Sequence, residues 1–329
     1  MTQKTVARPG APGQGPAVTV LGEVMIELSP QADGSFRPGV AGDTFNTAVA
    51  LAQLGVPSEY VTALGTDGFS RRIRTAIEAR GIGDSHIATS AGAVPGLYAI
   101  ETDAAGERRF TYWRDQSAAR QWFGDVDRFA ETFECMCPAP FFYWSGITLA
   151  LMAPAVRECL FRFLEAYRAG GGRVYFDSNY RAALWRSQDS VAAIYDSAIA
   201  HTDLYLPSLD DECAIRGLDS EVAITAALQR TGVAEAVMTL PGEALWITPQ
   251  QVTRYALPQS AAVVDTTGAG DAFSGALMAG LIGGAAMPAA IRFAHRVAAA
   301  VVGVQGALLP EKAWREFTEL CERELSCQP

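Results

Sequence analysis

The sequence predicts an α/β fold, a doubly wound and mostly parallel sheet with helices on both faces. Short apolar runs alternate with helical segments along most of the chain, and such alternation is typical of parallel sheets. The 329 residues, 49% of them hydrophobic, suffice for one large domain with a substantial core. Polar, glycine-rich segments follow several apolar runs, and ligands of such sheets bind beyond the carboxyl ends of the strands.

The expected elements follow from these runs in chain order. Strands are expected at 18–24, 59–64, 140–144, 174–177, 204–206, 236–239 and 244–248. Helices are expected at 42–54, 69–80, 154–169 and 190–200, and three more begin at Ala269, Pro288 and Glu311. Glycines at 55, 81 and 170–172 mark the ends of the first three helices.

A glycine-rich turn at 265–271, with the sequence DTTGAGD, is the most informative segment. It joins an apolar, strand-like run at 261–264 to an apolar segment at 272–281 that indicates a buried helix. Because N–H groups at a helix N-terminus are unpaired and the helix dipole favours an anion there, the turn is a candidate phosphate site. The amides concerned belong to Gly268, Ala269 and Gly270.

Asp271 stands out because a carboxylate beside a phosphate site repels the phosphate. Its expected role is that of a general base for a hydroxyl that attacks phosphorus. An ordinary Asp, with a pKa of about 3.9, is a weak base at pH 7; the structural alternative is a plain helix cap. A dinucleotide fingerprint is disfavoured because Phe273 occupies its third small position, and no Walker-type phosphate loop occurs in the chain.

A second constellation begins the helix expected at 42–54. Asp43 or Thr44 can cap this helix, and Asp43 and Asn46 lie on one face of its first turn. The amide of Asn46 offers donors and an acceptor, which suits a sugar hydroxyl. The alternative is that both side chains only satisfy the helix end.

Together the two patterns resemble the two signatures of the PfkB, or ribokinase-like, family of carbohydrate kinases. The first signature is matched at Ala41, Gly42, Asp43, Asn46, Ala48, Gly55 and Gly65, and the second from 265 to 278. The resemblance implies a ribokinase-like fold, ATP as the phosphoryl donor, and Mg²⁺ held mainly by nucleotide phosphates and water. It also implies that Asp265 supports the glycine turn or helps to bind a monovalent cation such as K⁺.

Further segments are similar to the branch of the family that phosphorylates 2-keto-3-deoxygluconate at its 6-hydroxyl. These are YWR followed by SAA at 112–119, and DSNYR followed by LW at 177–185. The substrate is a sugar acid, and the planar guanidinium groups of Arg114 and Arg181 suit its carboxylate. The alternative is that both are surface arginines in salt bridges.

The resemblance also implies a nucleotide side of the site. Its residues are Asn179, Ser208, Thr239, Pro241, Gly242 and the glycine-turn residues Gly268 and Gly270. Many family members carry an Asn-x-x-Glu loop that organises the magnesium water shell. Here Ser208 is followed by the carboxylates Asp211 and Glu212, and either of them could serve.

Two stretches, 26–40 and 96–113, lack helical periodicity and indicate short strands with turns. The resemblance implies that they form a small β-sheet lid that closes over the sugar, excludes water, and often forms a dimer contact. Tyr98 and Tyr112 are then lid residues that touch the substrate. The alternative is ordinary aromatic packing across a sheet.

Composition excludes several classes of partner. The net charge is −10, so nucleic acid is not expected, and no apolar run is long enough to predict a membrane helix. The six cysteines form no Cys-x-x-Cys pair, so free thiols and a cytoplasmic location are expected. Residues 1–16 are expected to be a disordered tail, 17–315 the kinase domain and 316–329 a C-terminal helix end and tail.

Three alternatives to the acid-sugar kinase remain open. Another sugar kinase of the same fold, such as a fructokinase or ribokinase, is the nearest. A non-catalytic sugar sensor would keep the fold, although the intact Asp271 and glycine turn argue against it. A nicotinamide dehydrogenase is disfavoured by Phe273 and by the late position of the glycine motif.

Overall fold

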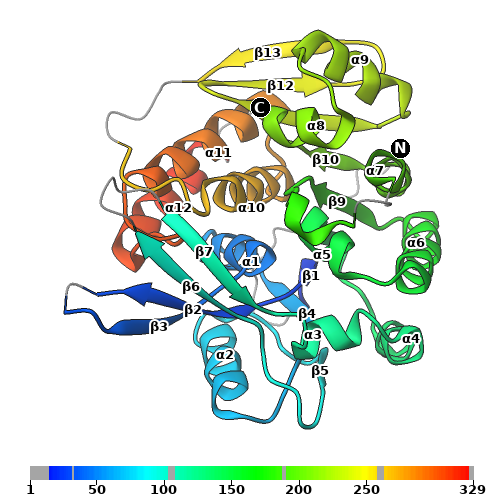
Figure 1. The fold of residues 1–329 in the computed structure, drawn as a ribbon. Helices are drawn as coiled ribbons and strands as arrows, with labels where there is room; N and C mark the ends of the chain where they lie inside the picture. Colours follow the sequence, from blue (N-terminus) through cyan, green and yellow to red (C-terminus); the bar gives the residue numbers. More distant parts are fainter. Residues whose placement is uncertain (1–14, 32, 103–107, 187–189, 258–262, 326–329) are drawn as a thin grey trace.

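A computed structural model describes residues 15–31, 33–102, 108–186, 190–257 and 263–325 (Figure 1). Within these residues a nine-stranded sheet has the order β13-β12-β11-β10-β9-β8-β1-β4-β5. The strands are β1 Val18–Leu21, β4 Ser58–Leu64, β5 Ile87–Thr89, β8 Phe141–Ser145, β9 Arg173–Asp177, β10 Leu204–Leu206, β11 Glu235–Leu240, β12 Glu243–Ile247 and β13 Val252–Ala256. All neighbouring strands from β5 to β11 pair in parallel, and β12 and β13 are antiparallel. The predicted fold class is confirmed.

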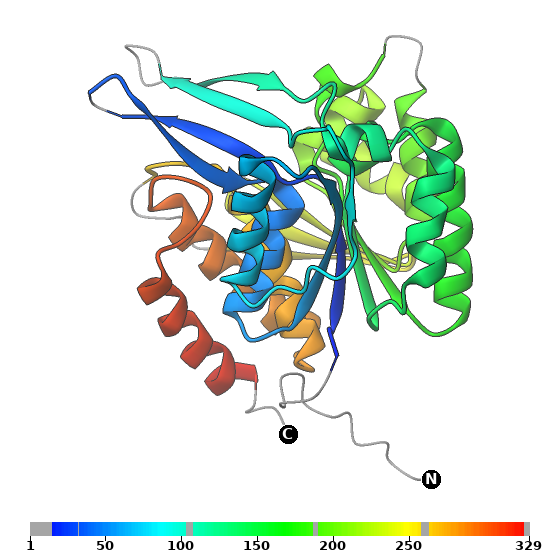
Figure 2. The ribbon, with the colours of Figure 1, turned by 90° about the horizontal axis from the view of Figure 1, so that it is seen from below.

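Helices cover both faces of this sheet (Figure 2). One face carries α1 Asp43–Gln53, α2 Gly68–Glu78, α10 Ala269–Ile282, α11 Met287–Val302 and α12 Glu311–Leu325. The other carries α3 Ala118–Trp122, α4 Val126–Cys135, α5 Gly146–Leu151, α6 Pro154–Ala169, α7 Val191–Ala200, α8 Leu209–Arg216 and α9 Glu221–Arg230. Because both faces are covered, every residue of β1 and β4 is buried, including the polar Thr19, Ser58, Glu59 and Thr62.

A second, four-stranded sheet stands beside the edge of the main sheet at which β1 ends (Figure 2). Its order is β3-β2-β6-β7, with β2 Met25–Pro30, β3 Phe36–Ala41, β6 Leu97–Thr102 and β7 Arg108–Trp113. The chain enters this sheet directly from β1 and leaves it from β3 directly into α1. We call it the lid sheet below. It occupies the two stretches for which the sequence predicted strands without helical periodicity.

Two local predictions are wrong. The N-cap of α1 is Gly42, without a side-chain cap, so neither Asp43 nor Thr44 caps the helix as expected. The expected strand before the glycine turn is absent where the structure describes it: Val263 and Val264 are 69% and 60% exposed and lie outside any strand, and 261–262 lie outside the described residues. Of the predicted disordered tail at 1–16, residues 1–14 lie outside the described residues.

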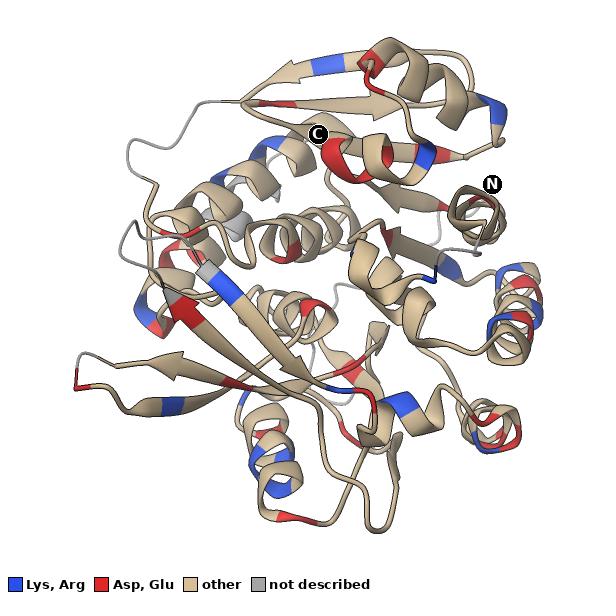
Figure 3. Cartoon of the chain, in the orientation of Figure 1, with Lys and Arg blue, Asp and Glu red and all other residues tan. Residues whose placement is uncertain are grey.

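Charged residues lie mostly on the outer helices and loops (Figure 3). Lysines and arginines are scattered over both helical layers in that view. No helix in the described part of the chain combines the length and the apolar character needed to cross a membrane.

Candidate active site

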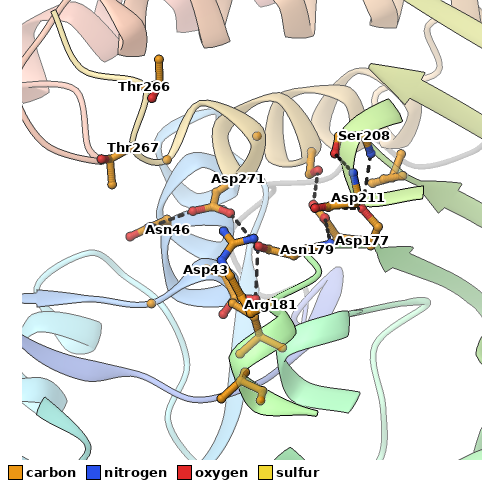
Figure 4. A pocket seen from close by; sticks show the side chains of 18 of the residues that line it. Asp43, Asn46, Asp177, Asn179, Arg181, Ser208, Asp211, Thr266, Thr267 and Asp271 are labelled. Carbon is orange, nitrogen blue, oxygen red and sulfur yellow. Dashed lines mark hydrogen bonds between the residues drawn. The ribbon is translucent and has the colours of Figure 1, made fainter. Parts of the chain in front are cut away.

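A cavity of about 820 Å³ lies where the carboxyl ends of β9 and β10, the first turns of α1 and α10, and the lid sheet meet (Figure 4). Five carboxylates among the described residues line it, those of Asp43, Asp115, Asp177, Asp211 and Asp271. Two guanidinium groups, of Arg114 and Arg181, line it as well. The location agrees with the general rule that ligands of parallel sheets bind beyond the carboxyl ends of the strands.

Asp271 lies in the first turn of α10 and is 8% exposed. Nδ2 of Asn46 donates a hydrogen bond to its Oδ2 at 2.8 Å. Burial, and next the Asp43 carboxylate, raise the pKa of Asp271 well above its ordinary value. The expectation of an ordinary, weakly basic Asp is therefore wrong, because the carboxylate is a stronger base in this environment.

The glycine turn is held by its own first residue. The Asp265 carboxylate accepts hydrogen bonds from the N–H groups of Thr267 (3.1 Å) and Gly306 (2.6 Å). Gly268 has a φ of +75° and caps α10. The N–H of Ala269 donates to the carbonyl of Thr266 at 3.3 Å, so it is already engaged. A Cβ on Gly270 would have no atom within 4 Å, so the backbone there borders open space.

Asp43 and Asn179 complete the polar floor of the cavity (Figure 4). The Asp43 carboxylate accepts a hydrogen bond from Oγ of Ser145, which is where its side chain goes instead of capping α1. Nδ2 of Asn179 lies 3.4 Å from Oδ2 of Asp43 and 3.5 Å from Oδ1 of Asp271. Asn179 was expected on the nucleotide side, but the structure puts its amide between these two carboxylates.

The two predicted arginines reach the cavity in different ways. Arg114 is 7% exposed and forms an ion pair with Glu23, so it is a buried group and not a surface arginine. Arg181 is exposed, and its side chain lies beside Asp43 and Asp271 (Figure 4). Both line the cavity.

Tyr98 and Tyr112 face each other across β6 and β7 and also line the cavity. Their ring centroids are 5.6 Å apart. The hydroxyl of Tyr98 donates to Glu27 on β2, whereas Tyr112 is 48% exposed. The two tyrosine rings therefore pack against each other across the strands and also border the cavity.

The predicted nucleotide residues separate into two groups. Ser208 and Thr239 line the cavity and join their segments through a β-bridge. Pro241 and Gly242 form the turn between β11 and β12, where Gly242 has a φ of +73°. Neither is among the described residues that line the cavity.

The structure also separates the two candidate metal carboxylates. Asp211 lines the cavity and accepts a hydrogen bond from Oγ of Ser178 at 2.6 Å. Glu212 is fully buried and pairs with Nε of Arg216 at 2.6 Å and with the hydroxyl of Tyr205. Glu212 is therefore not available at the cavity. The described residues contain no group of three or more His, Cys, Asp or Glu that could hold a metal by themselves.

Sequence reasoning missed two buried carboxylates at the site. Asp177 ends β9, and its Oδ2 accepts hydrogen bonds from the hydroxyls of Ser274 (2.7 Å) and Tyr143 (3.2 Å). Burial raises its pKa to about 7. Glu23, which holds Arg114 but does not itself line the cavity, is the other. Both are single carboxylates near the ends of expected strands, 174–177 and 18–24, which was a usable signal.

Comparisons with known proteins agree with this arrangement. Residues 16–314 match the pfkB family carbohydrate kinase domain. A 2-dehydro-3-deoxygluconokinase of Dickeya dadantii is 40% identical over 310 residues, which cover 90% of this chain and 97% of the relative. The enzyme of that name from Escherichia coli K12 is 38% identical, with 90% and 98% covered. A solved aminoimidazole riboside kinase of Salmonella enterica, complexed with aminoimidazole riboside and an ATP analog, has a TM-score of 0.77 at 25% identity and covers 92% of this chain and 99% of its own.

Proposed function

Because the chain belongs to the pfkB family of carbohydrate kinases, we propose that it phosphorylates 2-keto-3-deoxygluconate, also called 2-dehydro-3-deoxygluconate, with ATP. The product is 2-keto-3-deoxy-6-phosphogluconate. Two relatives with that activity in their names, at 38% and 40% identity, support the substrate. The single observation that carries the proposal is the buried Asp271 at the start of α10, in one cavity with Arg114 and Arg181.

The cavity suits an ATP–cation complex better than free ATP. Its lining carries five carboxylates and two guanidinium groups among the described residues, and carboxylates in this number do not favour a bare triphosphate without a cation. Asp211, with its neighbour Ser208 at the cavity, is the residue that would orient the water shell of Mg²⁺. The open backbone at Gly270 leaves room for phosphate oxygens.

When bound, the nucleotide and its metal supply the phosphoryl group and neutralise its charge. Within the chain, Asp43 and Asn46 bind sugar hydroxyls, and Asp271 accepts the proton of the 6-hydroxyl on its carboxylate. The amides of Gly268 and Gly270 stabilise the charge that develops on the transferred group. Arg114 and Arg181 fix the sugar carboxylate, and Tyr98 and Tyr112 cover the sugar from the lid sheet.

The roles of K⁺ and of the lid sheet in assembly are part of the same proposal. Asp265 supports the glycine turn through the two N–H groups that it accepts, which favours this role over K⁺ binding. The lid sheet exposes Phe36 (47%) and Trp113 (58%), and we propose that it pairs two copies of the chain in the cytoplasm.

A coupled ADP-release assay tests the proposal. The purified protein is given Mg²⁺ and ATP with 2-keto-3-deoxygluconate, gluconate, fructose or ribose in turn. We expect release with 2-keto-3-deoxygluconate to exceed release with each other sugar by at least about 100-fold in kcat/KM. Faster release with fructose or ribose would instead identify the neutral-sugar alternative, and no release with any sugar would favour a sensor.

A further inference from the structure

A buried carboxylate forms hydrogen bonds between two of the chain segments that connect the main sheet to the lid sheet. Glu23 lies between β1 and β2 and is 1% exposed. Its Oε2 accepts a hydrogen bond from Nη2 of Arg114, and its Oε1 accepts one from Oγ of Ser117. Both donors follow β7, the last strand of the lid sheet. Glu23 therefore links the entry of the chain into this sheet with its exit.

The surroundings of Glu23 leave little room for movement. A Cβ on Gly42 would lie 2.5 Å from the carbonyl oxygen of Glu23. A Cβ on Gly96, just before β6, would lie 2.9 Å from its Oε1. The backbone carbonyl excludes a side chain at Gly42, and a side chain at Gly96 would displace the Glu23 carboxylate, so glycine backbone packs directly against Glu23 from the two remaining connections. Glu23 is therefore contacted from the three other crossings between the two sheets: its carboxylate by Arg114, Ser117 and Gly96, and its backbone carbonyl by Gly42.

The partner of Glu23 keeps an unused donor. Nε of Arg114 is buried and has no hydrogen-bond partner among the described residues, although Arg114 lines the cavity. Its guanidinium carbon lies 5.8 Å from the ring centroid of Tyr112. A buried donor without an acceptor costs free energy, and an anionic ligand in the cavity can supply the acceptor.

We propose that Glu23 is a positioning residue for recognition of the sugar carboxylate. Glu23 accepts a hydrogen bond from one nitrogen of the Arg114 guanidinium and thereby fixes its orientation. The remaining N–H donors of Arg114 are then already oriented for the sugar carboxylate before the substrate binds. This inference rests on the proposed function. Because Glu23 offsets the charge of Arg114, recognition by this pair depends on the direction of donors and less on net charge.

The test uses Glu23→Gln, which keeps the size of the side chain and removes its charge. Since the sugar carboxylate is remote from the reacting hydroxyl, its contacts act equally on bound substrate and transition state. We expect KM for 2-keto-3-deoxygluconate to rise about tenfold, with kcat and KM for ATP changed less than about threefold. In an Arg114→Ala background the same substitution is expected to cause no further rise.

Asp203→Asn is the matched control, because it also removes a carboxylate from an ion pair, with Arg168, at the opposite end of the main sheet. It is expected to leave KM unchanged. Should Glu23→Gln fail a thermal unfolding check, Glu23→Asp keeps the charge but shortens the side chain, and the same rise in KM is expected. Equal effects of Glu23→Gln in both backgrounds, or an unchanged KM in the folded variant, overturn the positioning role.

The two proposals fail in different ways. If the unmodified protein releases no ADP with 2-keto-3-deoxygluconate, the proposed function is wrong. If it does so, and folded Glu23→Gln has the KM of the unmodified protein, only the positioning role is wrong.

Discussion

Asp271 is a stronger base in the folded chain than an exposed aspartate, because burial and the Asp43 carboxylate raise its pKa. Replacing it by Asn keeps an oxygen that can accept the hydrogen bond from Asn46, but removes the base. We predict that Asp271→Asn lowers kcat by a factor of about 10² to 10⁴, with little change in KM for either substrate. ADP release measures this, and a kcat within tenfold of the unmodified protein would contradict the role of Asp271.

The pKa of Asp177, raised to about 7 mainly by burial, predicts a pH dependence of stability. In the unfolded chain this carboxyl titrates near its ordinary pKa of about 3.9. Between about pH 4 and pH 7 the folded state therefore binds more protons than the unfolded state, and the free energy of unfolding falls as pH rises. The three-unit shift corresponds to at most about 4 kcal/mol.

Asp177→Asn removes this contribution. We predict a smaller difference in unfolding temperature between pH 5 and pH 8 for the variant than for the unmodified protein. Thermal unfolding at the two pH values checks it. An equal difference in both proteins would show that Asp177 titrates near its ordinary pKa in the folded chain.

Asp211 and Glu212 are neighbours in α8 with opposite surroundings, and a pair of substitutions distinguishes their roles. Glu212→Gln removes the buried partner of Arg216, which keeps its ion pair with the more exposed Asp196, so we predict a loss of about 1–3 kcal/mol in the free energy of unfolding with kcat preserved. Asp211→Asn is predicted to lower kcat/KM for Mg²⁺-ATP by about tenfold or more with little loss of stability. Denaturant unfolding measures the loss of stability, and ADP release at varied Mg²⁺ measures the loss of kcat/KM. If Glu212→Gln lowered kcat/KM and Asp211→Asn lowered stability, the two assignments would be exchanged.

At the scale of elements, the first turn of α10 requires glycine at position 268. Its φ is +75°, and a Cβ there would lie 2.6 Å from the carbonyl oxygen of Ala307. We predict that Gly268→Ala lowers the free energy of unfolding by about 1–3 kcal/mol and lowers kcat by shifting the turn. Gly270→Ala serves as the stability control, since its Cβ meets open space. Equal stability of the two variants would contradict the strain.

Long elements with local end signals could be predicted from the sequence, and short helices could not. Gly55 and Gly81 have positive φ values where their helices end, as expected, because a left-handed position is a local requirement. The helices α3, α4, α5, α8 and α9 were not predicted, although each begins after a Ser or Asp whose side chain caps its first turn. They have five to ten residues each, and packing against the sheet contributes more to such short helices than local sequence does.

The candidate site shows the same division. Asp271, Asp43 and Asn46 were found because each lies at a helix start with a recognisable pattern. Their contact was not predictable from spacing, since Asn46 and Asp271 are 225 positions apart in the chain. Glu23 stands near the end of the expected strand at 18–24, and its role escaped notice because its partner, Arg114, is 91 positions away. Tertiary contacts of this range are decided by topology.

At the scale of the whole molecule, the topology gathers these distant segments. The parallel strands β9 and β10 deliver Asp177 and Ser208 to one edge of the sheet, and α1 and α10 begin at that edge. The lid sheet leaves the same edge after β1 and brings Tyr98, Tyr112 and Arg114 over it. A net charge of −10 does not attract an acidic sugar, so the arginines at this edge must recognise its carboxylate through directed N–H donors.

The exposed part of one face of the lid sheet predicts the assembly state; Ile26, Val40 and Leu97 of this face pack against the main core, whereas Phe36 and Trp113 are exposed. The strand registers place Trp113 opposite Leu97, Leu97 opposite Ile26, and Ile26 opposite Val40, so Trp113 and Val40 share a face. By the alternation of side chains along β3, Phe36 shares it too, while Tyr112 points to the other face. Trp113 and Phe36 are 58% and 47% exposed, and large exposed apolar side chains on one face are typical of interfaces.

We therefore predict that the protein is a dimer in solution, with about twice the 35.0 kDa mass of one chain, and that the double variant Phe36→Asp, Trp113→Asp is a monomer. Two charges placed on a buried interface face cost several kcal/mol of association free energy. Light scattering after size-exclusion chromatography measures the mass.

Because the substituted side chains lie on the face away from Tyr98 and Tyr112, a higher KM for the sugar in the monomer would show that dimerisation stabilises the position of the lid sheet over the cavity. A single 35.0 kDa species from the unmodified protein would contradict the proposed interface.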